Sequence, residues 1–386
     1  MKQQRTIHPK IHPYRVDFPQ ADLDDLNERL SRTRWPDELT SFNAHWDYGV
    51  PVAWVRELVA YWRTGFDWRA QEARLNAHPQ FVTRIDGTDV HFLHVTSPES
   101  DALPLVLTHG WPGSVFEFLD LIGPLTDPRA HGADPADAFH VVVPSLPGFG
   151  LSGPTREPGW DRTRVARAWI ELVDRLGYGG RWGAHGGDVG SLVGRELGVL
   201  RPDGLVGTHV TQVFAFPGGD EKELAELTPE EHRRLGVLGT FRTRDGYQAI
   251  QSTRPQTLAY GLTDSPAGQL AWNAELFNNF GDVVDMVDRD AFLANVALYW
   301  LTGTAGSAAR IYYEDSRSGA WEREEPNTVP TGVAVFPDDF LSIRRFAERA
   351  NNITHWTEFR EGGHFAALEV PELLVGDIRR FFGSLR

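Results

Sequence analysis

The hydrophobic pattern begins with a stretch of mixed helices and strands. Residues 23–35 (LDDLNERLSRTRW) place apolar side chains at helical spacing, and Pro36 ends this run. Residues 52–75 predict one long helix or two short ones. Apolar and polar residues then alternate over 81–95 (FVTRIDGTDVHFLHV), and the central Asp-Gly pair predicts a tight turn between two antiparallel strands. Residues 1–98 are therefore expected to form a helical segment that leads into a β-hairpin.

Continuous apolar runs, separated by helical stretches, follow this segment. The runs over 103–110 and 139–148 end in Gly or Pro and predict buried strands. Residues 180–188 follow at similar spacing, and 204–213 predict a further strand. Helical periodicity occupies 115–125, 162–176 and 191–200. Strands and helices that alternate in this way predict an α/β fold with a mostly parallel, doubly wound sheet.

A helical insertion interrupts the predicted sheet. Between 214 and 313 the period is helical, with Trp, Tyr and Phe interspersed, which indicates an inserted cap. A strand followed by a loop returns over 331–340 and again over 354–365, and an amphipathic helix closes the chain over 372–385. The expected organisation has four parts: the N-terminal segment 1–98, the first half of the α/β core 99–213, the helical cap 214–313 and the second half of the core 314–386.

The composition narrows the classes of partner and chemistry. Of the 386 residues, 41% are hydrophobic and 11% aromatic, which suffices for a large core and an apolar pocket. A net charge of −15 argues against nucleic acid and anionic membrane surfaces as partners. The chain has no Cys, so disulfides, thiol nucleophiles and thiolate metal sites are excluded. No apolar signal-peptide core and no apolar run near roughly 18 residues is present, so a cytoplasmic protein without a membrane span is expected.

Candidate catalytic residues follow several of the predicted strands. In GAHGGDVGS (183–191), Asp188 occupies the centre of a Gly-x-nucleophile-x-Gly turn, where most hydrolases have serine. His109, the pair Asp338-Asp339 and His364 also stand at the ends of predicted strands, and sites in open α/β sheets lie at the carboxyl ends of strands. Each residue alone is explained by a turn or a loop. Together, in the order nucleophile, acid, histidine, they predict a catalytic triad.

A carboxylate nucleophile points to attack on a saturated carbon. Serine would form an ether there, which water does not cleave, whereas aspartate forms an ester that can be hydrolysed at its own carbonyl carbon. In this scheme His364 activates water and Asp339 holds the imidazole. The backbone N–H groups of Trp111 and Val189 would then form the oxyanion hole.

Two substrate classes suit this chemistry, namely epoxides and alkyl halides. A leaving halide needs only weak donors, commonly the N–H of Trp. A ring-opening epoxide develops an alkoxide, a strong base, and benefits from the more acidic O–H of tyrosine.

The motifs around these residues resemble those of the microsomal-type epoxide hydrolases of the α/β-hydrolase fold, over nearly the whole chain. The matching segments include YRVDFPQADLDDLNERLSRTRWPDE (14–38), HGWPGSVFEF (109–118), PSLPGFGLS (144–152), GGDVGS (186–191), YWLTGT (299–304), FPDD (336–339) and GGHFAALEVPELL (362–374). The resemblance implies an α/β-hydrolase fold with an N-terminal epoxide hydrolase domain. It also implies Asp188 as nucleophile, His364 as base and Asp339 as the acid.

The resemblance further implies two tyrosines from the cap. Residues 246–266 resemble the segment that holds the first tyrosine, which places it at Tyr247. The segment ARIYYED (309–315) resembles the one that holds the second, which we assign to Tyr312, with Tyr313 as the neighbouring alternative. The resemblance implies no cofactor and no metal, and the expected partners are a small-molecule epoxide and water. The sequence does not decide between a monomer and a homodimer.

Three features depart from the family pattern. Val189 follows the nucleophile, where Trp is usual in the family. The smaller side chain widens the pocket at this position, which favours a bulky natural-product epoxide. Asp339 stands where Glu is frequent, and the anchor of the mammalian relatives has no counterpart before Ile7. The alternatives are a haloalkane or haloacid dehalogenase with the same nucleophile, or a catalytically inactive ligand-binding protein on the same fold.

Overall fold

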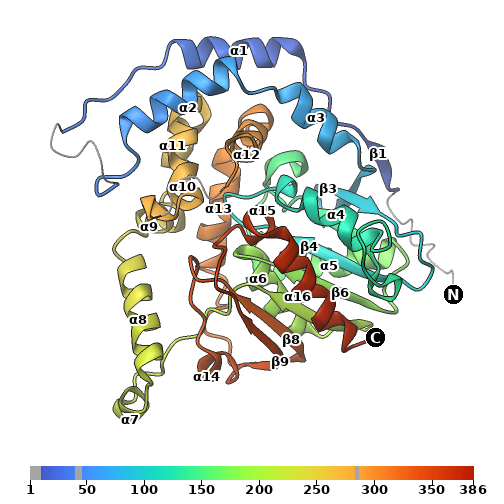
Figure 1. The fold of residues 1–386 in the computed structure, drawn as a ribbon. Helices are drawn as coiled ribbons and strands as arrows, with labels where there is room; N and C mark the ends of the chain where they lie inside the picture. The colour runs from blue at the N-terminus through green and yellow to red at the C-terminus, as the bar shows by residue number, and fades with distance from the viewer. Residues whose placement is uncertain (1–9, 40–45, 283–286) are drawn as a thin grey trace, which may run out of the picture.

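In the computed structural model the chain is described over residues 10–39, 46–282 and 287–386. Within these ranges nine strands form one sheet in the order β1-β2-β3-β5-β4-β6-β7-β8-β9 (Figure 1). The strands are β1 His12–Tyr14, β2 Gln80–Ile85, β3 Thr88–Val95, β4 Leu103–Thr108, β5 Phe139–Pro144, β6 Trp182–Gly186, β7 Leu205–Val210, β8 Asn327–Val335 and β9 Asn351–Glu358. Neighbours pair antiparallel from β1 through β3 to β5, and parallel from β5 to β9.

Helices cover both faces of this sheet. Those that pack on or beside the parallel strands are η1 Val115–Phe118, α4 Leu119–Thr126, α5 Arg162–Arg175, α6 Val189–Leu200, α14 Arg344–Ala347, α15 Ala366–Glu369 and α16 Pro371–Gly383. Two further short turns are η2 Pro135–Asp137 and η3 Gly150–Ser152. Helices α4 and α16 contact each other and the sheet, and α5 packs beside α6, which contacts four of the strands.

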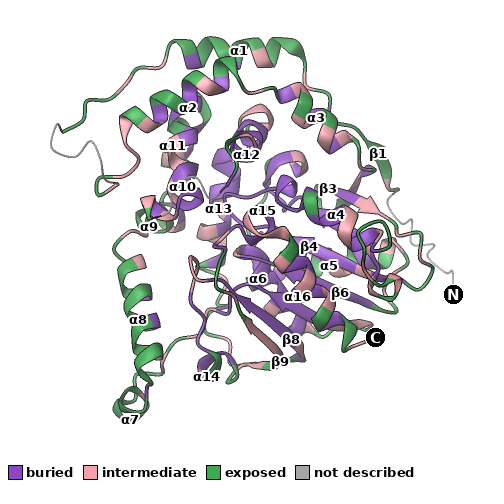
Figure 2. Ribbon diagram, viewed as in Figure 1, coloured by how far each residue is buried: buried purple, intermediate pink, exposed green. Residues whose placement is uncertain are grey.

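The central strands are apolar on both sides because both faces are covered. Along β4, Leu105 and Leu107 belong to the buried cluster that includes α4 and α16, whereas Val106 belongs to the cluster that includes α5 and α6. Figure 2 shows the central strands as mostly buried, the edge strands β1 and β9 as more exposed, and much of the outward surface of the helices as exposed. Continuous apolar runs, rather than alternation, are the expected pattern of such doubly covered strands.

The remaining helices form an N-terminal layer and a cap. The N-terminal helices are α1 Gln20–Ser31, α2 Val52–Thr64 and α3 Trp68–Asn76. The cap contains α7 Glu221–Ala225, α8 Pro229–Phe241, α9 Gly246–Thr253, α10 Pro255–Asp264, α11 Pro266–Phe277, η4 Asn279–Gly281, α12 Arg289–Thr302 and α13 Ala305–Asp315. Helices α1 and α2 lie over α11 (Figure 1), and the Tyr61 hydroxyl donates to Asp290 at 2.6 Å. The N-terminal layer therefore braces the cap.

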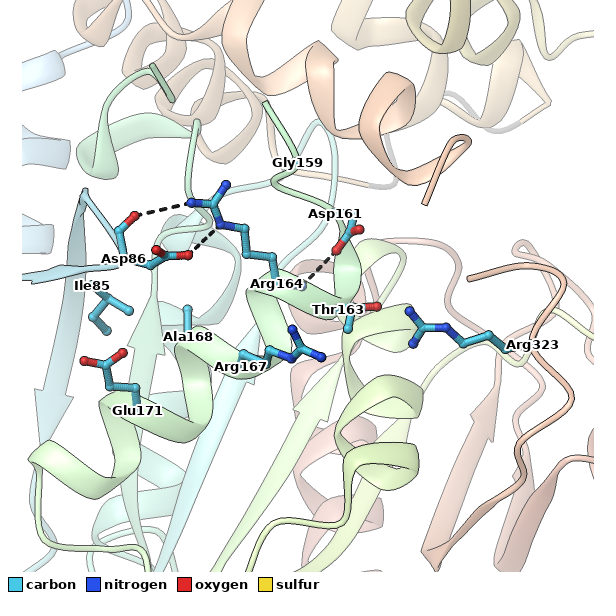
Figure 3. Close-up of a pocket in the computed structure, with 10 residues that line it drawn as sticks. All are labelled: Ile85, Asp86, Gly159, Asp161, Thr163, Arg164, Arg167, Ala168, Glu171 and Arg323. Carbon is cyan, nitrogen blue, oxygen red and sulfur yellow. Dashed lines mark hydrogen bonds and ion pairs between the residues drawn. The ribbon is translucent and has the colours of Figure 1, made fainter. Parts of the chain in front are cut away.

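The β2–β3 hairpin is fixed to the core through its turn. Asp86 and Gly87 both have positive φ angles, 45° and 78°, as the predicted two-residue turn requires. Arg164 of α5 donates to the Asp86 carboxylate at 2.7 Å, and both residues line a surface cleft of about 520 Å³ (Figure 3). This ion pair ties the hairpin to the helix that covers the central strands.

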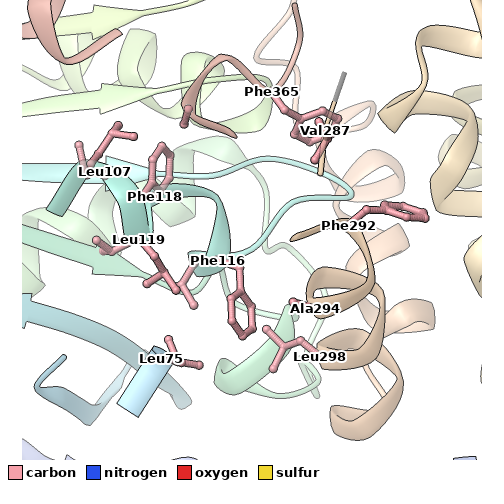
Figure 4. Packing of buried hydrophobic residues seen from close by; sticks show 14 of the residues in the cluster. Leu75, Leu107, Phe116, Phe118, Leu119, Val287, Phe292, Ala294, Leu298 and Phe365 are labelled. Carbon is pink, nitrogen blue, oxygen red and sulfur yellow. The ribbon is translucent and has the colours of Figure 1, made fainter. Parts of the chain in front are cut away.

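One buried cluster joins all three layers. Leu75 of α3, Phe116 and Phe118 of η1, and Phe292 and Leu298 of α12 belong to it (Figure 4). Because these side chains come from the N-terminal layer, the core and the cap, their common burial holds the cap above the carboxyl ends of the strands.

The predicted hairpin, the central strands and the closing helix are confirmed, with differences at element ends. Residues 52–75 form two helices because Asp67 caps α3 by accepting from the N–H groups of Arg69 and Ala70. The short edge strand β1 was not predicted. Among the described residues, no helix combines the length and the apolar character needed to cross a bilayer. The expectation about the segment before Ile7 lies outside the described residues.

Candidate active site

Asp188 occupies the turn between β6 and α6. Its backbone angles are φ 51° and ψ −120°, a region that L-residues rarely adopt. The neighbouring glycines permit this turn: a Cβ on Gly190 would lie 2.0 Å from the Thr108 carbonyl oxygen, and a Cβ on Gly186 would lie 2.4 Å from the backbone of Gly190. The sequence motif thus presents the Asp188 side chain above the carboxyl end of the sheet.

The Asp188 carboxylate faces the two backbone donors that the sequence predicts. The Trp111 N–H donates to Asp188 Oδ1 at 2.8 Å, and the Val189 N–H also hydrogen-bonds to the carboxylate. Burial raises the pKa of Asp188, whereas the charge of His364 and these two hydrogen bonds oppose that rise. The same two donors can stabilise negative charge on this oxygen when it becomes part of a tetrahedral intermediate.

His364 and Asp339 lie beside Asp188 as a hydrogen-bonded pair. His364 Nδ1 is 2.8 Å from Asp339 Oδ1, and His364 Nε2 is 3.9 Å from Asp188 Oδ2. Burial alone would lower the pKa of His364, but the charge and hydrogen bond of Asp339, with the charge of Asp188, raise it to about 9. The other acid of the sequence pair, Asp338, makes no hydrogen bond to His364 and instead bridges to Gly363 through its backbone.

The two proposed cap tyrosines meet above Trp111. The ring of Tyr247, from α9, stacks on the Trp111 ring at 5.1 Å, and the ring of Tyr312, from α13, meets it edge-on at 5.7 Å. Burial, followed by the charge of Asp188, raises the pKa of both phenols above the usual value, so both keep their protons and can donate. Tyr313 instead stacks under the guanidinium of Arg317 at 3.7 Å.

His109, which also follows a predicted strand, has structural contacts. Its Nε2 accepts from the Leu146 N–H at 3.2 Å, and its Nδ1 lies 2.9 Å from the Gly110 carbonyl oxygen. Burial lowers the pKa of His109 to about 4, so the ring stays neutral between these partners. It holds the turn that carries Trp111.

Sequence reasoning missed two buried polar residues at the site. Gln212 follows β7 and accepts from the Asp188 N–H at 2.6 Å, while its amide nitrogen donates to Asp339. Glu117 of η1 is 8% exposed, and burial, with a smaller contribution from Asp188, raises its pKa to about 8. Gln212 stands near the end of the strand predicted over 204–213, so its position was a usable signal. Glu117 lies in an apolar stretch and gave none.

Neither the cleft of Figure 3 nor a metal-binding cluster provides a second candidate site in the described residues. The cleft in Figure 3 contains none of the residues above, and its Arg164 is paired with Asp86. Within the described ranges, no group of three or more His, Cys, Asp or Glu side chains could hold a metal ion.

Comparisons with known proteins agree with the resemblance seen in the motifs. The chain matches "Epoxide hydrolase N terminus" over residues 11–118 and "Alpha/beta hydrolase family" over residues 105–377. It is 46% identical over 383 residues to an epoxide hydrolase homologue from Stigmatella aurantiaca, which covers 97% of this chain and 86% of the relative.

Two solved structures have the same fold over nearly their full length. Aspergillus niger epoxide hydrolase has a TM-score of 0.86 and 32% identity, with 99% of this chain and 97% of that chain covered. Juvenile hormone epoxide hydrolase from the silkworm Bombyx mori has a TM-score of 0.89 and 28% identity, with 99% and 96% covered. The predicted α/β-hydrolase fold is confirmed, and the chain belongs to the epoxide hydrolase family.

Proposed function

We propose that the chain converts an epoxide and water to a vicinal diol through a covalent ester on Asp188. The observation that carries the proposal is the set of groups that surround the Asp188 carboxylate. One oxygen accepts from Trp111 N at 2.8 Å, and the other lies 3.9 Å from His364 Nε2. The buried Tyr247 and the half-buried Tyr312 lie beside Trp111. This arrangement places a nucleophile, a base and two proton donors close to one another.

The first step forms the ester. Asp188 Oδ2 attacks a ring carbon of the epoxide, and the bond between that carbon and the ring oxygen breaks. The ring oxygen takes a proton from Tyr247 or Tyr312 and becomes the first hydroxyl of the product. Because burial and the Asp188 charge hold both phenols neutral, each can donate as the oxygen gains negative charge.

The second step hydrolyses the ester. His364 Nε2 takes a proton from water, and the resulting hydroxide attacks the Asp188 carboxyl carbon. The N–H groups of Trp111 and Val189 stabilise the oxyanion, and the alkyl oxygen leaves with the proton from His364 as the second hydroxyl. The carboxyl group that hydrolysis leaves on Asp188 then returns a proton to the tyrosinate formed in the first step. The oxygen of Asp188 thus enters the diol, and the oxygen of water stays on Asp188.

Formation of the ester on Asp188 also changes the pKa of His364, the proposed base. In the free site the charges of Asp339, Asp188 and Glu117 all raise the pKa of His364, and the result is about 9. Glu369 of α15 is a fourth carboxyl that interacts with His364. An ester carries no charge, so the contribution of Asp188 disappears and the pKa of His364 falls. Alkylation therefore favours the neutral imidazole that the second step needs.

This coupling predicts the pH dependence of ester hydrolysis. A base is active only when deprotonated, so the hydrolysis rate should rise with pH through a midpoint below about 9. Alkylation should be lost only at low pH, where Asp188 is protonated. Single-turnover mixing between pH 5 and 10, with the two rates measured separately, checks both statements. A hydrolysis midpoint at 9 or above would contradict the coupling.

The residue after the nucleophile supports a bulky, natural-product-like epoxide as the substrate. Val189 is 7% exposed and belongs to the same apolar cluster as Trp111 and Tyr247. Its side chain is much smaller than the Trp usual at this position of the family. A valine at this position leaves space for a larger ligand beside Asp188 than a tryptophan would.

Substitution of this residue tests the substrate size. Val189→Trp should lower kcat/KM for a bulky aryl epoxide by at least about 10-fold relative to a small alkyl epoxide, because overpacking opposes the larger ligand. Val193→Ile, in the same helix but fully buried, serves as the control for a packing change. An unchanged ratio between the two substrates in Val189→Trp would remove the argument for a bulky substrate.

A further inference from the structure

Gln212 occupies a position between the nucleophile and the acid. It lies two residues after the end of β7 and is 2% exposed. The turn of Asp188 lies at the end of β6, and Asp339 follows β8, so Gln212 stands between them at the carboxyl edge of the sheet. Asp339 is also buried, with 3% of its side chain exposed.

The two ends of the Gln212 amide have different partners. Gln212 Oε1 accepts from the Asp188 N–H at 2.6 Å and from the Ser191 hydroxyl at 3.0 Å. Gln212 Nε2 donates to Asp339 Oδ2, and the other oxygen of Asp339 bonds to His364. A backbone N–H only donates and a carboxylate only accepts, so one orientation of the amide satisfies both contacts.

Each of these two contacts of Gln212 holds one group of the site in place. The Asp188 N–H belongs to a residue with positive φ, and its bond to Gln212 fixes that backbone conformation. The bond to Asp339 fixes the rotation of the carboxylate that orients His364. A neutral amide makes both contacts without adding charge beside the carboxylates of Asp188 and Asp339.

We propose that Gln212 is a positioning residue that sets the His364–Asp339 pair against the Asp188 backbone for ester hydrolysis. This inference rests on the proposed two-step reaction. Hydrolysis depends on Gln212 more than alkylation does, because the base must reach a water aimed at the Asp188 carboxyl carbon. During alkylation, Trp111 and Val189 still hold the attacking carboxylate.

Two substitutions separate this role from simple packing. Gln212→Leu removes both hydrogen bonds at similar volume and should slow ester hydrolysis about 10- to 100-fold, with alkylation changed less than about threefold, since small misplacements of a catalytic group have effects of this size. Gln212→Glu keeps an acceptor for the Asp188 N–H but adds a carboxyl group beside Asp339. The carboxylates that already face His364 are Asp339, Asp188, Glu117 and Glu369. The additional carboxylate in Gln212→Glu should raise the pH midpoint of ester hydrolysis by about one unit.

The measurement is single-turnover mixing with a styrene-type epoxide, followed as ester formation and ester decay across pH. Thr208→Val is the control, since Thr208 is buried on β7, the strand that Gln212 follows, and contacts Thr331. It should leave both rates and the midpoint unchanged, and thermal melting reports whether each variant folds. Wild-type hydrolysis in Gln212→Leu, or a wild-type midpoint in Gln212→Glu, would overturn the role of Gln212. If Gln212→Leu does not fold, the midpoint of Gln212→Glu decides. A wild-type enzyme that forms no ester would instead contradict the two-step reaction.

Discussion

His364→Gln should convert the enzyme into one that is alkylated by its substrate and then stops. Glutamine cannot take a proton from water, so the second step loses its general base, which typically contributes about 10² to 10⁴ in rate. Asp188 and the donors from Trp111 and Val189 remain in place, so the first step continues. The ester should therefore accumulate and diol release should become very slow.

Intact-protein mass spectrometry after mixing with an epoxide measures this accumulation directly. The mass of His364→Gln should increase by that of one substrate molecule, and peptide mapping should place the addition on Asp188. His355→Gln is the matched control, because His355 bonds to Asp377 and does not contact Asp188. An unmodified His364→Gln that demonstrably binds substrate would contradict the assignment of His364 to the second step.

Removal of both cap phenols should abolish ester formation from epoxides. Tyr247→Phe and Tyr312→Phe each take away one donor to the ring oxygen, and loss of one such donor typically slows a reaction by about 10² to 10³. Since the two rings lie 5.9 Å apart and both face the Asp188 charge, either phenol can partly replace the other. The single losses should not add, and the double variant should form almost no ester.

The neighbouring tyrosine provides the control for this experiment. Tyr313→Phe removes a phenol from the same helix, but that ring lies against Arg317 and not against Trp111. It should alkylate at the wild-type rate, and ester hydrolysis should be nearly unchanged in all these variants. A double variant that alkylates as fast as the wild type would show that the tyrosines are core residues.

The fold was predictable where one physical pattern dominates a segment. Strands covered on both faces, such as β4 and β5, are continuous apolar runs, and the Asp-Gly turn of the hairpin leaves few alternatives. Strand β1 was not predicted because it is three exposed residues long and exists through its pairing with β2. The break between α2 and α3 depends on a single cap at Asp67, which periodicity does not reveal.

The candidate site was predictable as far as it depends on strand ends. Asp188, Asp339 and His364 each follow a strand, so the topology alone brings them to one edge of the sheet. Tyr312 and Tyr313 are adjacent on α13 and point in different directions, so only the packing of α13 against Trp111 distinguishes them. Gln212 was missed because its importance lies in the two partners that it joins, Asp188 and Asp339.

The identity of the nucleophile is the central claim, and the origin of the product oxygen tests it most directly. A single turnover in oxygen-18 water, with enzyme in excess over epoxide, should give largely unlabelled diol, because the new hydroxyl oxygen comes from Asp188. The label should appear in the Asp188 carboxylate and reach the diol only in later turnovers. Diol that is fully labelled in the first turnover, with no label on Asp188, would mean that water attacks the epoxide directly and would contradict the covalent reaction.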